Sequence, residues 1–202
     1  MSDIRKRTID TYNQSAKRLA AYFQGIGARV SDIEQALDLA GRPQNARVVE
    51  IGCGDGRDAK EIVKRVGWYR GFDISEELIK LAEESLAGSC FEVADATEYG
   101  FPGNLDVVFA FASLLHLDKN EVRAVLGRVH ESLKPGGIFF ISLKERPEYS
   151  QEIKDDQYGL RLFYFYNPRI IAELAGKGYE TVAISQHVIG HTDWFEIALK
   201  KV

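Results

Sequence analysis

Short apolar runs recur along the middle of the chain and have the length and character of buried strands. They occupy residues 47–51, 69–73, 90–94, 105–112 and 138–143. Segments with helical apolar spacing separate them: one at 58–66, one that begins with Ser75 as N-cap, and one that begins with a capping box from Asp118 to Glu121. Strands that alternate with helices of this length predict a parallel α/β sheet with right-handed crossovers.

The N-terminal part of the chain has helical spacing at 3–24 and 31–40, and the second segment carries a capping box from Ser31 to Glu34. This predicts two helices ahead of the first strand. Neither a repeat nor a Pro/Ser-rich linker divides the sequence. We therefore expect one domain with a helical N-terminal extension.

The C-terminal part departs from the strand and helix alternation. Asn167-Pro168 has the pattern of an N-cap followed by proline in the first turn, and it predicts a helix that ends within 176–178. Two β-rich runs follow, at 179–189 and 193–201, and a short glycine-containing segment joins them. The sequence therefore predicts that an antiparallel hairpin closes the parallel sheet.

The charge balance gives no general attraction for nucleic acid. The 202 residues include 26 Lys and Arg against 30 Asp and Glu, for a formal net charge of −4. Residues 1–30 alone hold six basic and two acidic side chains, which is a net charge of +4. This arm is typical of a solvated helix face, and contact with an anionic substrate is the alternative.

Neither a membrane span nor a secretory signal is visible in the sequence. The longest apolar run is residues 107–112, whereas a span needs roughly 18 residues. Cys53 and Cys90 form neither a disulfide framework nor a metal-binding motif. We expect a soluble cytoplasmic protein with both cysteines reduced and no metal.

A glycine-rich loop follows the first predicted strand, where Glu50 precedes Gly52, Gly54 and Gly56. Doubly wound sheets bind ligands at this position. Glycines permit positive φ and let a ligand touch the backbone, while the free N–H groups of the next helix attract an anion. The GxGxG spacing departs from the GxGxxG fingerprint of dinucleotide binding and points away from NAD.

Two aspartates follow the next two strands. Asp73 ends the second strand and can accept both hydroxyls of a ribose, a contact that NAD enzymes also use. Asp95 lies just past the third strand, where a carboxylate beside a free backbone N–H matches the edge of an adenine. Ribose hydroxyls, an adenine and an amino-acid carboxylate thus each find a partner along three consecutive strand ends.

Six motifs occur in a fixed order along the chain: VVEIGCGDGRDA, GFDIS, VADATE, LDVVFAFASLLHL, LKPGGIFFISLKE and DWFEIALKK. In order and spacing the chain resembles the class I S-adenosylmethionine-dependent methyltransferases of the small-molecule type, over roughly residues 8–202. The resemblance implies a Rossmann-like seven-stranded sheet ordered 3-2-1-4-5-7-6, with strand seven antiparallel. It also implies a helical cap at 1–45, a cofactor-binding half at 46–143, and a lid with the closing hairpin at 144–202.

The resemblance further implies a site for S-adenosylmethionine, which would leave as S-adenosylhomocysteine. Glu50 would serve the methionine part or would cap the loop structurally, and Arg57 would reach the carboxylate or pair with Asp58 or Glu61. The implied cofactor residues are Glu50, Gly52, Cys53, Gly54, Arg57, Asp73, Ile74, Asp95, Ala96, Phe111, Ala112 and Tyr12.

Methyl transfer from a sulfonium needs a general base only if the acceptor must lose a proton. His116 follows the fourth strand and is the candidate base, with a pocket-shaping histidine as the alternative. Tyr12 lies in a segment that resembles the family's cofactor-covering helix, although Leu19 stands where a second tyrosine is common. Its alternative is a packing role.

The segment 145–166 is expected to form the acceptor pocket, because it combines arginines with a run of aromatic residues. The candidate pocket residues are Arg146, Tyr158, Arg161 and Tyr164. Such walls suit a flat or anionic acceptor, whereas the alternative is that the aromatic side chains belong to the core.

The sequence favours an enzyme that methylates a small molecule. A methyltransferase for RNA or protein that uses the basic N-terminal arm is a second hypothesis, and a protein that binds the cofactor without catalysis is a third. The acceptor atom and the oligomeric state do not follow from the sequence.

Overall fold

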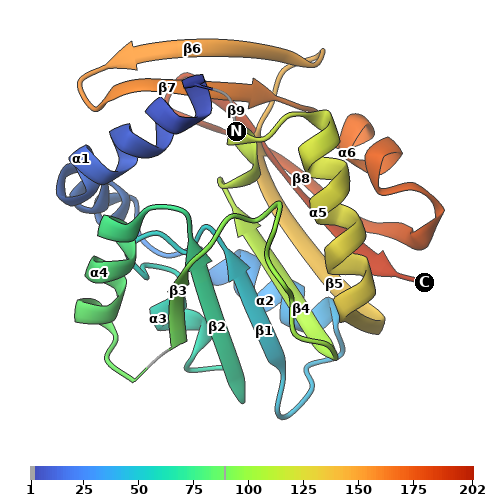
Figure 1. The fold of residues 1–202 in the computed structure, drawn as a ribbon. Helices are drawn as coiled ribbons and strands as arrows, with labels where there is room; N and C mark the ends of the chain where they lie inside the picture. The colour runs from blue at the N-terminus through green and yellow to red at the C-terminus, as the bar shows by residue number, and fades with distance from the viewer. Residues whose placement is uncertain (1–2, 89) are drawn as a thin grey trace.

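The computed structural model describes residues 3–88 and 90–202, which form a central sheet with helices on both faces (Figure 1). The helices are α1 (Asp3–Ile26), α2 (Val30–Leu39), α3 (Ala59–Ile62), α4 (Glu76–Ser85), α5 (Lys119–Ser132) and α6 (Pro168–Ala175), with 3-10 turns η1 (Leu114–His116) and η2 (Gly176–Gly178). The strands are β1 (Arg47–Ile51), β2 (Trp68–Asp73), β3 (Cys90–Val93), β4 (Leu105–Phe111), β5 (Leu133–Lys144), β6 (Ser150–Asp156), β7 (Gly159–Phe165), β8 (Tyr179–Ile189) and β9 (Thr192–Lys201). Within the described ranges, none of the helices has the length and apolar character needed to cross a bilayer.

The main sheet has seven strands in the order β3-β2-β1-β4-β5-β9-β8. Strands β1 to β5 are parallel to their neighbours, whereas β9 runs antiparallel to both β5 and β8. The predicted order is therefore confirmed, once the additional hairpin β6–β7 is counted between the fifth strand and the last two. The carboxyl ends of the parallel strands all lie at one edge, where such sheets bind ligands.

Successive residues of the central strands face opposite sides of the sheet. Val48 is in register with Val107, and both pack with the apolar faces of α2, α3 and α4. Val49 is in register with Val108, and both pack with α5 and α6. Because both faces are covered, β4 is buried along its whole length, as its continuous apolar run predicted.

The carboxyl edge is covered by α1 and the two-stranded hairpin β6–β7, which Figure 1 shows above the strand ends. Three hydroxyl side chains on α1 hold it against the hairpin. Thr8 Oγ1 accepts from Leu162 N at 3.0 Å, and Thr11 and Ser15 donate to the carbonyls of Leu160 and Tyr158 at 2.7 and 2.6 Å. Residues 8, 11 and 15 lie on one helix face, so α1 and β7 form one roof.

Two local predictions were wrong. Helix α2 begins one residue earlier than expected, after Arg29, and Ser31 lies inside it without capping it. Glu34 cannot complete a capping box because it pairs with Arg65 at 2.5 Å. Helix α3 is shorter than the predicted 58–66, because tighter turns follow it, with Arg65 N bonded to the Ile62 carbonyl at 2.9 Å. The other N-caps, Ser75, Asp118 and Asn167, are confirmed.

Candidate functional site

The glycine loop after β1 has the backbone that its sequence requires. Gly52 and Gly54 have φ angles of +70° and +57°, which side chains other than glycine rarely tolerate. A Cβ on Gly52 would lie 2.3 Å from the Cβ of Ser113, so this glycine also permits close packing of two strand ends. A Cβ on Gly54 would have no neighbour within 4 Å, which leaves open space directly above the loop.

Asp73 ends β2 beside this loop and helps to hold its shape. Its Oδ2 accepts from Gly54 N at 3.0 Å and its Oδ1 accepts from Ser75 N at 2.9 Å. Burial raises the pKa of this carboxyl, although the backbone N–H groups act in the opposite direction. Each oxygen keeps a second acceptor position, which is the arrangement that a ribose diol needs. The ribose role stays a prediction.

Glu50 lies below the loop and does not line the cavity. It is 1% exposed and accepts a hydrogen bond of 2.6 Å from the Tyr69 hydroxyl. Burial and the nearby Asp58 carboxylate raise the pKa of Glu50 to about 8. This position agrees with the structural alternative, in which Glu50 supports the loop from inside the protein.

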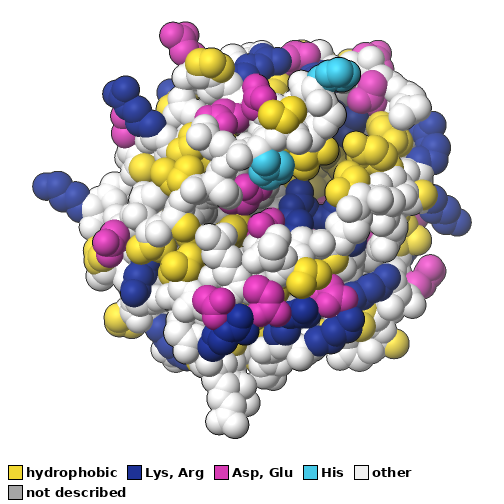
Figure 2. Space-filling view, turned by 180° about the vertical axis from the view of Figure 1, so that it is seen from behind, with side chains coloured by type: hydrophobic (Ala, Val, Ile, Leu, Met, Phe, Trp, Pro, Cys, Tyr) yellow, Lys and Arg dark blue, Asp and Glu magenta, His cyan; other side chains and the backbone are white. Residues whose placement is uncertain are grey.

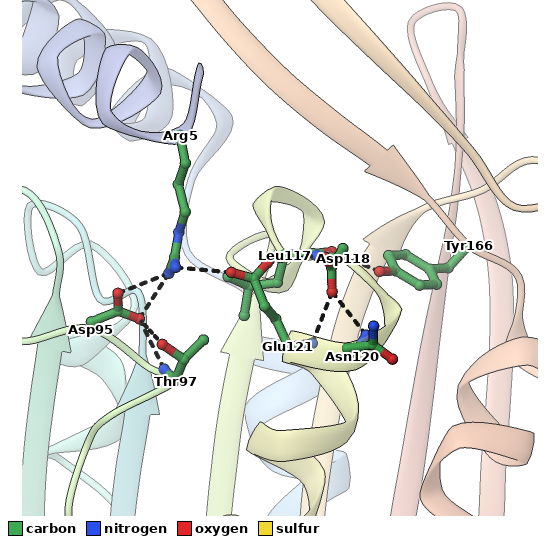
Figure 3. Close-up of polar contacts among 8 residues, drawn as sticks. All are labelled: Arg5, Asp95, Thr97, Leu117, Asp118, Asn120, Glu121 and Tyr166. Carbon is green, nitrogen blue, oxygen red and sulfur yellow. Dashed lines mark hydrogen bonds and ion pairs between the residues drawn. The ribbon is translucent and has the colours of Figure 1, made fainter. Parts of the chain in front are cut away.

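Asp95 lies at the cavity beyond β3 and is held by α1 (Figure 3). Both of its oxygens accept from Arg5 Nη2, at 2.8 and 2.9 Å, and Thr97 donates its N–H and hydroxyl to Oδ1. Arg5 also donates to Glu121 on α5 at 2.9 Å. Burial opposes ionisation of Asp95, but the bonds from Thr97 and Arg5 lower its pKa overall. The helix of the roof is thus tied to two elements of the Rossmann-like core.

The chain leaves β4 through an unusual backbone conformation. Ala112 has a φ of +54°, and its N–H donates to the Ser142 carbonyl at 3.0 Å. Strained residues of this kind cluster at ligand sites. The next residue, Ser113, lines the cavity with a buried hydroxyl that has no hydrogen-bond partner among the described residues.

Arg57 and Arg29 lie on the loop side of the cavity. Arg57 pairs with Asp58, as its alternative reading expected, and its Nε is buried without a partner among the described residues. Arg29 lies 3.5 Å from the same carboxylate and 5.3 Å above the Phe111 ring. Arg29, Arg57 and Asp58 together carry one excess positive charge, which would stabilise the methionine carboxylate of a cofactor even though Asp55 also lines this side of the cavity.

Tyr12 and His116 meet in the interior of the cavity. The Tyr12 hydroxyl and His116 Nε2 are 2.8 Å apart, and His116 Nδ1 lies 2.6 Å from the Leu162 carbonyl. A carbonyl only accepts, so Nδ1 carries the proton and Tyr12 donates to Nε2. Burial, with a smaller effect from Arg161 and other cations, lowers the pKa of His116 to about 3. A neutral histidine of this kind positions Tyr12 and is a poor general base.

The hairpin brings only half of its predicted residues to the cavity. Tyr158 and Arg161 line it, whereas Arg146 and Tyr164 do not. Arg146 pairs with Glu152 and lies 3.6 Å from the Phe165 ring centroid, and Tyr164 stacks on Tyr149. Side chains alternate across a strand, so the run of aromatic residues in β7 places its members on different sides.

The lining also includes residues that were not singled out from the sequence, among them Arg29, Lys144 and Trp194. Lys144 ends β5 at the ligand-binding edge of the sheet. Asp73 was identified from the sequence because residues at the carboxyl ends of parallel strands bind ligands. The same rule could have found Lys144. Trp194 lies at the start of β9 in register with Lys144, a pairing that only the antiparallel hairpin creates.

A single cavity of about 460 Å³ connects these groups, and its volume is in the range of small-molecule sites. The open space at Gly54 and the unpartnered Ser113 hydroxyl fit a ligand that lies against the loop. The chemistry around the cavity fits a charged adenosyl amino acid. The lining includes the following predicted cofactor residues: Tyr12, Gly52, Cys53, Gly54, Arg57, Asp73, Ile74, Asp95, Ala96, Phe111 and Ala112.

Comparison with known sequences agrees with this site. A family model described as a methyltransferase domain matches residues 48–137. A ubiquinone biosynthesis O-methyltransferase of Methylococcus capsulatus is 33% identical over 66% of the chain and 57% of that protein. Phosphoethanolamine N-methyltransferase 1 of Triticum aestivum is 29% identical over 64% of the chain and 28% of its own length. Trans-aconitate 2-methyltransferase of Variovorax paradoxus is 28% identical over 64% and 50%. The chain thus spans about a quarter to three-fifths of these curated relatives.

Solved structures share the fold over a larger part of the chain. The DhpI-SAH complex superposes with a TM-score of 0.73 and 20% identity, and the match covers 98% of this chain and 97% of that one. The glycopeptide N-methyltransferase MtfA, solved with S-adenosyl-L-homocysteine, gives a TM-score of 0.67 at 18% identity over 83% and 89%. At these identities the likeness concerns the fold.

Proposed function

Since the chain belongs to the class I, Rossmann-like S-adenosylmethionine-dependent methyltransferases, we propose that it transfers the methyl group of this cofactor to a small-molecule acceptor. The observation that carries the proposal is the cavity. It joins Gly54 and Asp73 on the loop side to Tyr12, Tyr158 and Arg161 under the roof. Its volume of about 460 Å³ suits a cofactor together with a small acceptor.

This arrangement assigns different tasks to the two sides of the cavity. The floor consists of the strand ends with the glycine loop, and the roof consists of α1 and the hairpin β6–β7. When bound, S-adenosylmethionine would supply an electrophilic methyl group, which an acceptor's lone pair attacks in line as the methyl–sulfur bond breaks and S-adenosylhomocysteine leaves. Asp73, the glycine loop and Arg57 would hold the cofactor. Tyr12, with its hydroxyl oriented by His116, would cover it, and α1 with the hairpin would exclude water and position the acceptor.

Arginines of the basic N-terminal arm are engaged in contacts within the protein, which favours a small acceptor over RNA. Arg5 pairs with Asp95 and Glu121, Arg18 bonds the Gln157 carbonyl, and Arg29 pairs with Asp58. On the face shown in Figure 2, acidic and basic side chains are interspersed. These arginines hold the roof and the loop, so their charge is not presented as one continuous surface for a polyanion.

The names of relatives give the range of acceptors to examine. They include an N-methyltransferase of phosphoethanolamine and O-methyltransferases of ubiquinone biosynthesis, and a 2-methyltransferase of trans-aconitate. The acceptors that these names state are small molecules. The division of this chain into a cap, a cofactor-binding half and a lid stays part of the proposal.

Calorimetric titration with S-adenosylmethionine and S-adenosylhomocysteine, with NAD as control, tests the proposal. We expect micromolar binding of the first two and none of NAD. A radiolabelled methyl group then follows transfer to pools of candidate metabolites and to total RNA. Failure of both adenosyl compounds to bind would contradict the proposal, and transfer to RNA alone would replace its small-molecule part.

A further inference from the structure

Lys144 places an ammonium group without an acidic partner in the acceptor part of the cavity. Its Nζ lies 4.2 Å from the ring centroid of Phe163 and 5.8 Å from that of Trp194. Among residues 3–88 and 90–202, no carboxylate lies within 4 Å of it, whereas each arginine that lines the cavity has an ion pair. These arginines are Arg5, Arg29, Arg57 and Arg161.

Arg161 supplies a second cation against the same aromatic ring. Its guanidinium carbon lies 5.2 Å from the Phe163 centroid, and its side chain is only 9% exposed. One Nη group donates to Asp156 at 2.5 Å, but Nε is buried with no partner within the described part of the chain. A buried N–H donor without an acceptor is costly, and a ligand in the cavity would satisfy it.

The local field is positive even though carboxylates are near. Burial, Lys154 and Arg161 lower the pKa of Lys144 to about 8, and this combination outweighs the opposite effect of Asp156 and Glu152. Near pH 7 most of the lysine is charged. Lys144 and Arg161 lie beside the same aromatic ring, and of the two only Arg161 has an ion pair within the described ranges, so a bound anion would compensate the remaining charge.

We propose that Lys144 and Arg161 form an anion subsite of the acceptor pocket, so that the methyl acceptor is a small molecule with a carboxylate or a phosphate-type group. Phe163, Trp194 and Tyr158 form the apolar walls beside this subsite. The inference rests on the proposed function, because it takes the second occupant of the cavity to be the acceptor.

The state of His116 agrees with an anionic acceptor. An oxyanion carries a free lone pair and needs no base before it accepts a methyl group. His116 remains neutral and receives the Tyr12 proton in its hydrogen bond, which makes it unsuited to deprotonating an acceptor. The pocket thus offers charge stabilisation for an anion and no base for a neutral hydroxyl acceptor, which would have to lose a proton.

The cofactor carboxylate is the competing occupant of this subsite. It has its own cations on the loop side, where Arg29 and Arg57 surround Asp58. Lys144 instead ends β5, which is separated from β1 in the sheet by β4. Measurements with the protein saturated by S-adenosylhomocysteine therefore isolate the acceptor subsite.

Benzoate and phenylphosphonate serve as carboxylate and phosphate-type probes, and benzamide serves as a neutral probe of the same shape. Titration calorimetry on the full chain with saturating S-adenosylhomocysteine should show at least one anion binding about tenfold tighter than benzamide. The tighter of the two anions identifies which group the acceptor carries.

Variants separate direct contact from a general charge effect. Lys144→Gln should remove the preference for the anion and leave the affinity for S-adenosylhomocysteine unchanged. Lys154→Gln is the matched control, since this lysine lies on the same roof but does not line the cavity, and it should preserve the preference. Asp156→Asn frees Arg161 from its ion pair and should strengthen anion binding.

Three results would overturn the inference: equal binding of benzamide and both anions, no binding of either anion at millimolar concentration, or equal losses in Lys144→Gln and Lys154→Gln. Reduced affinity of Lys144→Gln for S-adenosylhomocysteine, with unchanged thermal stability, would assign Lys144 to the cofactor instead. Failure of the proposed function looks different, because S-adenosylhomocysteine then does not bind even the unmodified chain.

Discussion

The floor and the roof of the cavity are built in different ways. The floor consists of strand ends, where Gly54 and Asp73 present backbone and carboxylate groups that the sheet holds in place. The roof consists of α1 and the hairpin β6–β7, which touch each other through Thr8, Thr11 and Ser15. The floor is fixed by the hydrogen bonds of seven strands, and the roof depends on a few side-chain contacts.

This difference separates general from specific tasks. The floor carries the residues that are proposed to bind the cofactor, and the positive backbone angles of its loop favour glycine. The roof is proposed to contact the acceptor, and as a surface element it should tolerate change without disturbing the sheet. Substitutions in the floor should therefore affect cofactor binding strongly, while those in the roof should have smaller effects.

Gly54→Val should have the largest effect. The β-branched side chain would occupy the open space above the loop, where the cofactor is proposed to lie, and would adopt an unfavourable positive φ. We expect a folded protein with no measurable binding of S-adenosylmethionine by calorimetry.

Two other glycines serve as controls for this variant. Gly41→Val introduces the same backbone strain, with φ of +78° and open space, but it lies outside the cavity and should retain binding. Gly52→Val collides with Ser113 and should lower the thermal unfolding midpoint. Normal affinity in a folded Gly54→Val protein would show that the ligand lies elsewhere.

Asp73→Ala should have the next largest effect. It removes the two charge-assisted bonds that Asp73 is proposed to make to the ribose, which would be worth about 2–4 kcal/mol, or roughly 30- to 700-fold in Kd. The variant also releases the N–H groups of Gly54 and Ser75. Asp73→Asn keeps one carbonyl oxygen and should show an intermediate loss. Unchanged affinity for S-adenosylhomocysteine in both variants would remove Asp73 from the ribose site.

The floor could be predicted from the sequence because its signals are local. The glycine loop, Asp73 and Asp95 each follow a recognisable strand within a few residues, and adjacent parallel strands bring their ends together. The capping box at Asp118 is local in the same sense. The sheet order followed from the resemblance to the family and from the closing hairpin.

The roof could not be predicted to the same depth, since its contacts join distant residues. Arg146 and Arg161 look equivalent in the sequence, but Arg161 lies on β7 and lines the cavity, whereas Arg146 precedes β6 and pairs with Glu152. The hydroxyl of Tyr12 meets His116 across more than one hundred positions of the chain. The expected cap of α2 failed for the same reason, because Glu34 has a distant partner in Arg65.

His116 allows a test of the roof by pH. With its pKa lowered to about 3 in the folded protein, the unfolded chain binds a proton more readily, so acidification favours unfolding. Between pH 6.5 and 3 the free energy of unfolding should fall by about 1.4 kcal/mol per pH unit through this residue.

Denaturant titrations at several pH values measure this slope. His116→Gln should flatten the acid slope relative to the unmodified protein. Tyr12→Phe removes the hydroxyl bond but keeps the imidazole, and it should preserve the slope. Identical pH profiles of the unmodified protein and His116→Gln would mean that His116 is not held neutral under the roof.

Arg5→Gln should have the smallest effect, because it loosens the tie between roof and floor but leaves the glycine loop and Asp73 in place. Arg5 joins α1 to Asp95 and Glu121 through partly buried ion pairs, and each such pair contributes about 1 kcal/mol or less (Figure 3). Since Asp95 ionises below its usual pKa, the tie persists above pH 4 and weakens only as the pH falls through that lowered value. We expect a few-fold weaker affinity for S-adenosylmethionine and faster hydrogen exchange in α1, with the sheet unchanged.

Lys6→Gln removes a neighbouring exposed charge and should change neither the affinity nor the exchange rate. Equal exchange of α1 in Arg5→Gln and the unmodified chain would show that other contacts to the core, such as Asn13 with Ser75 and Gln24 with Asp55, hold this helix without Arg5.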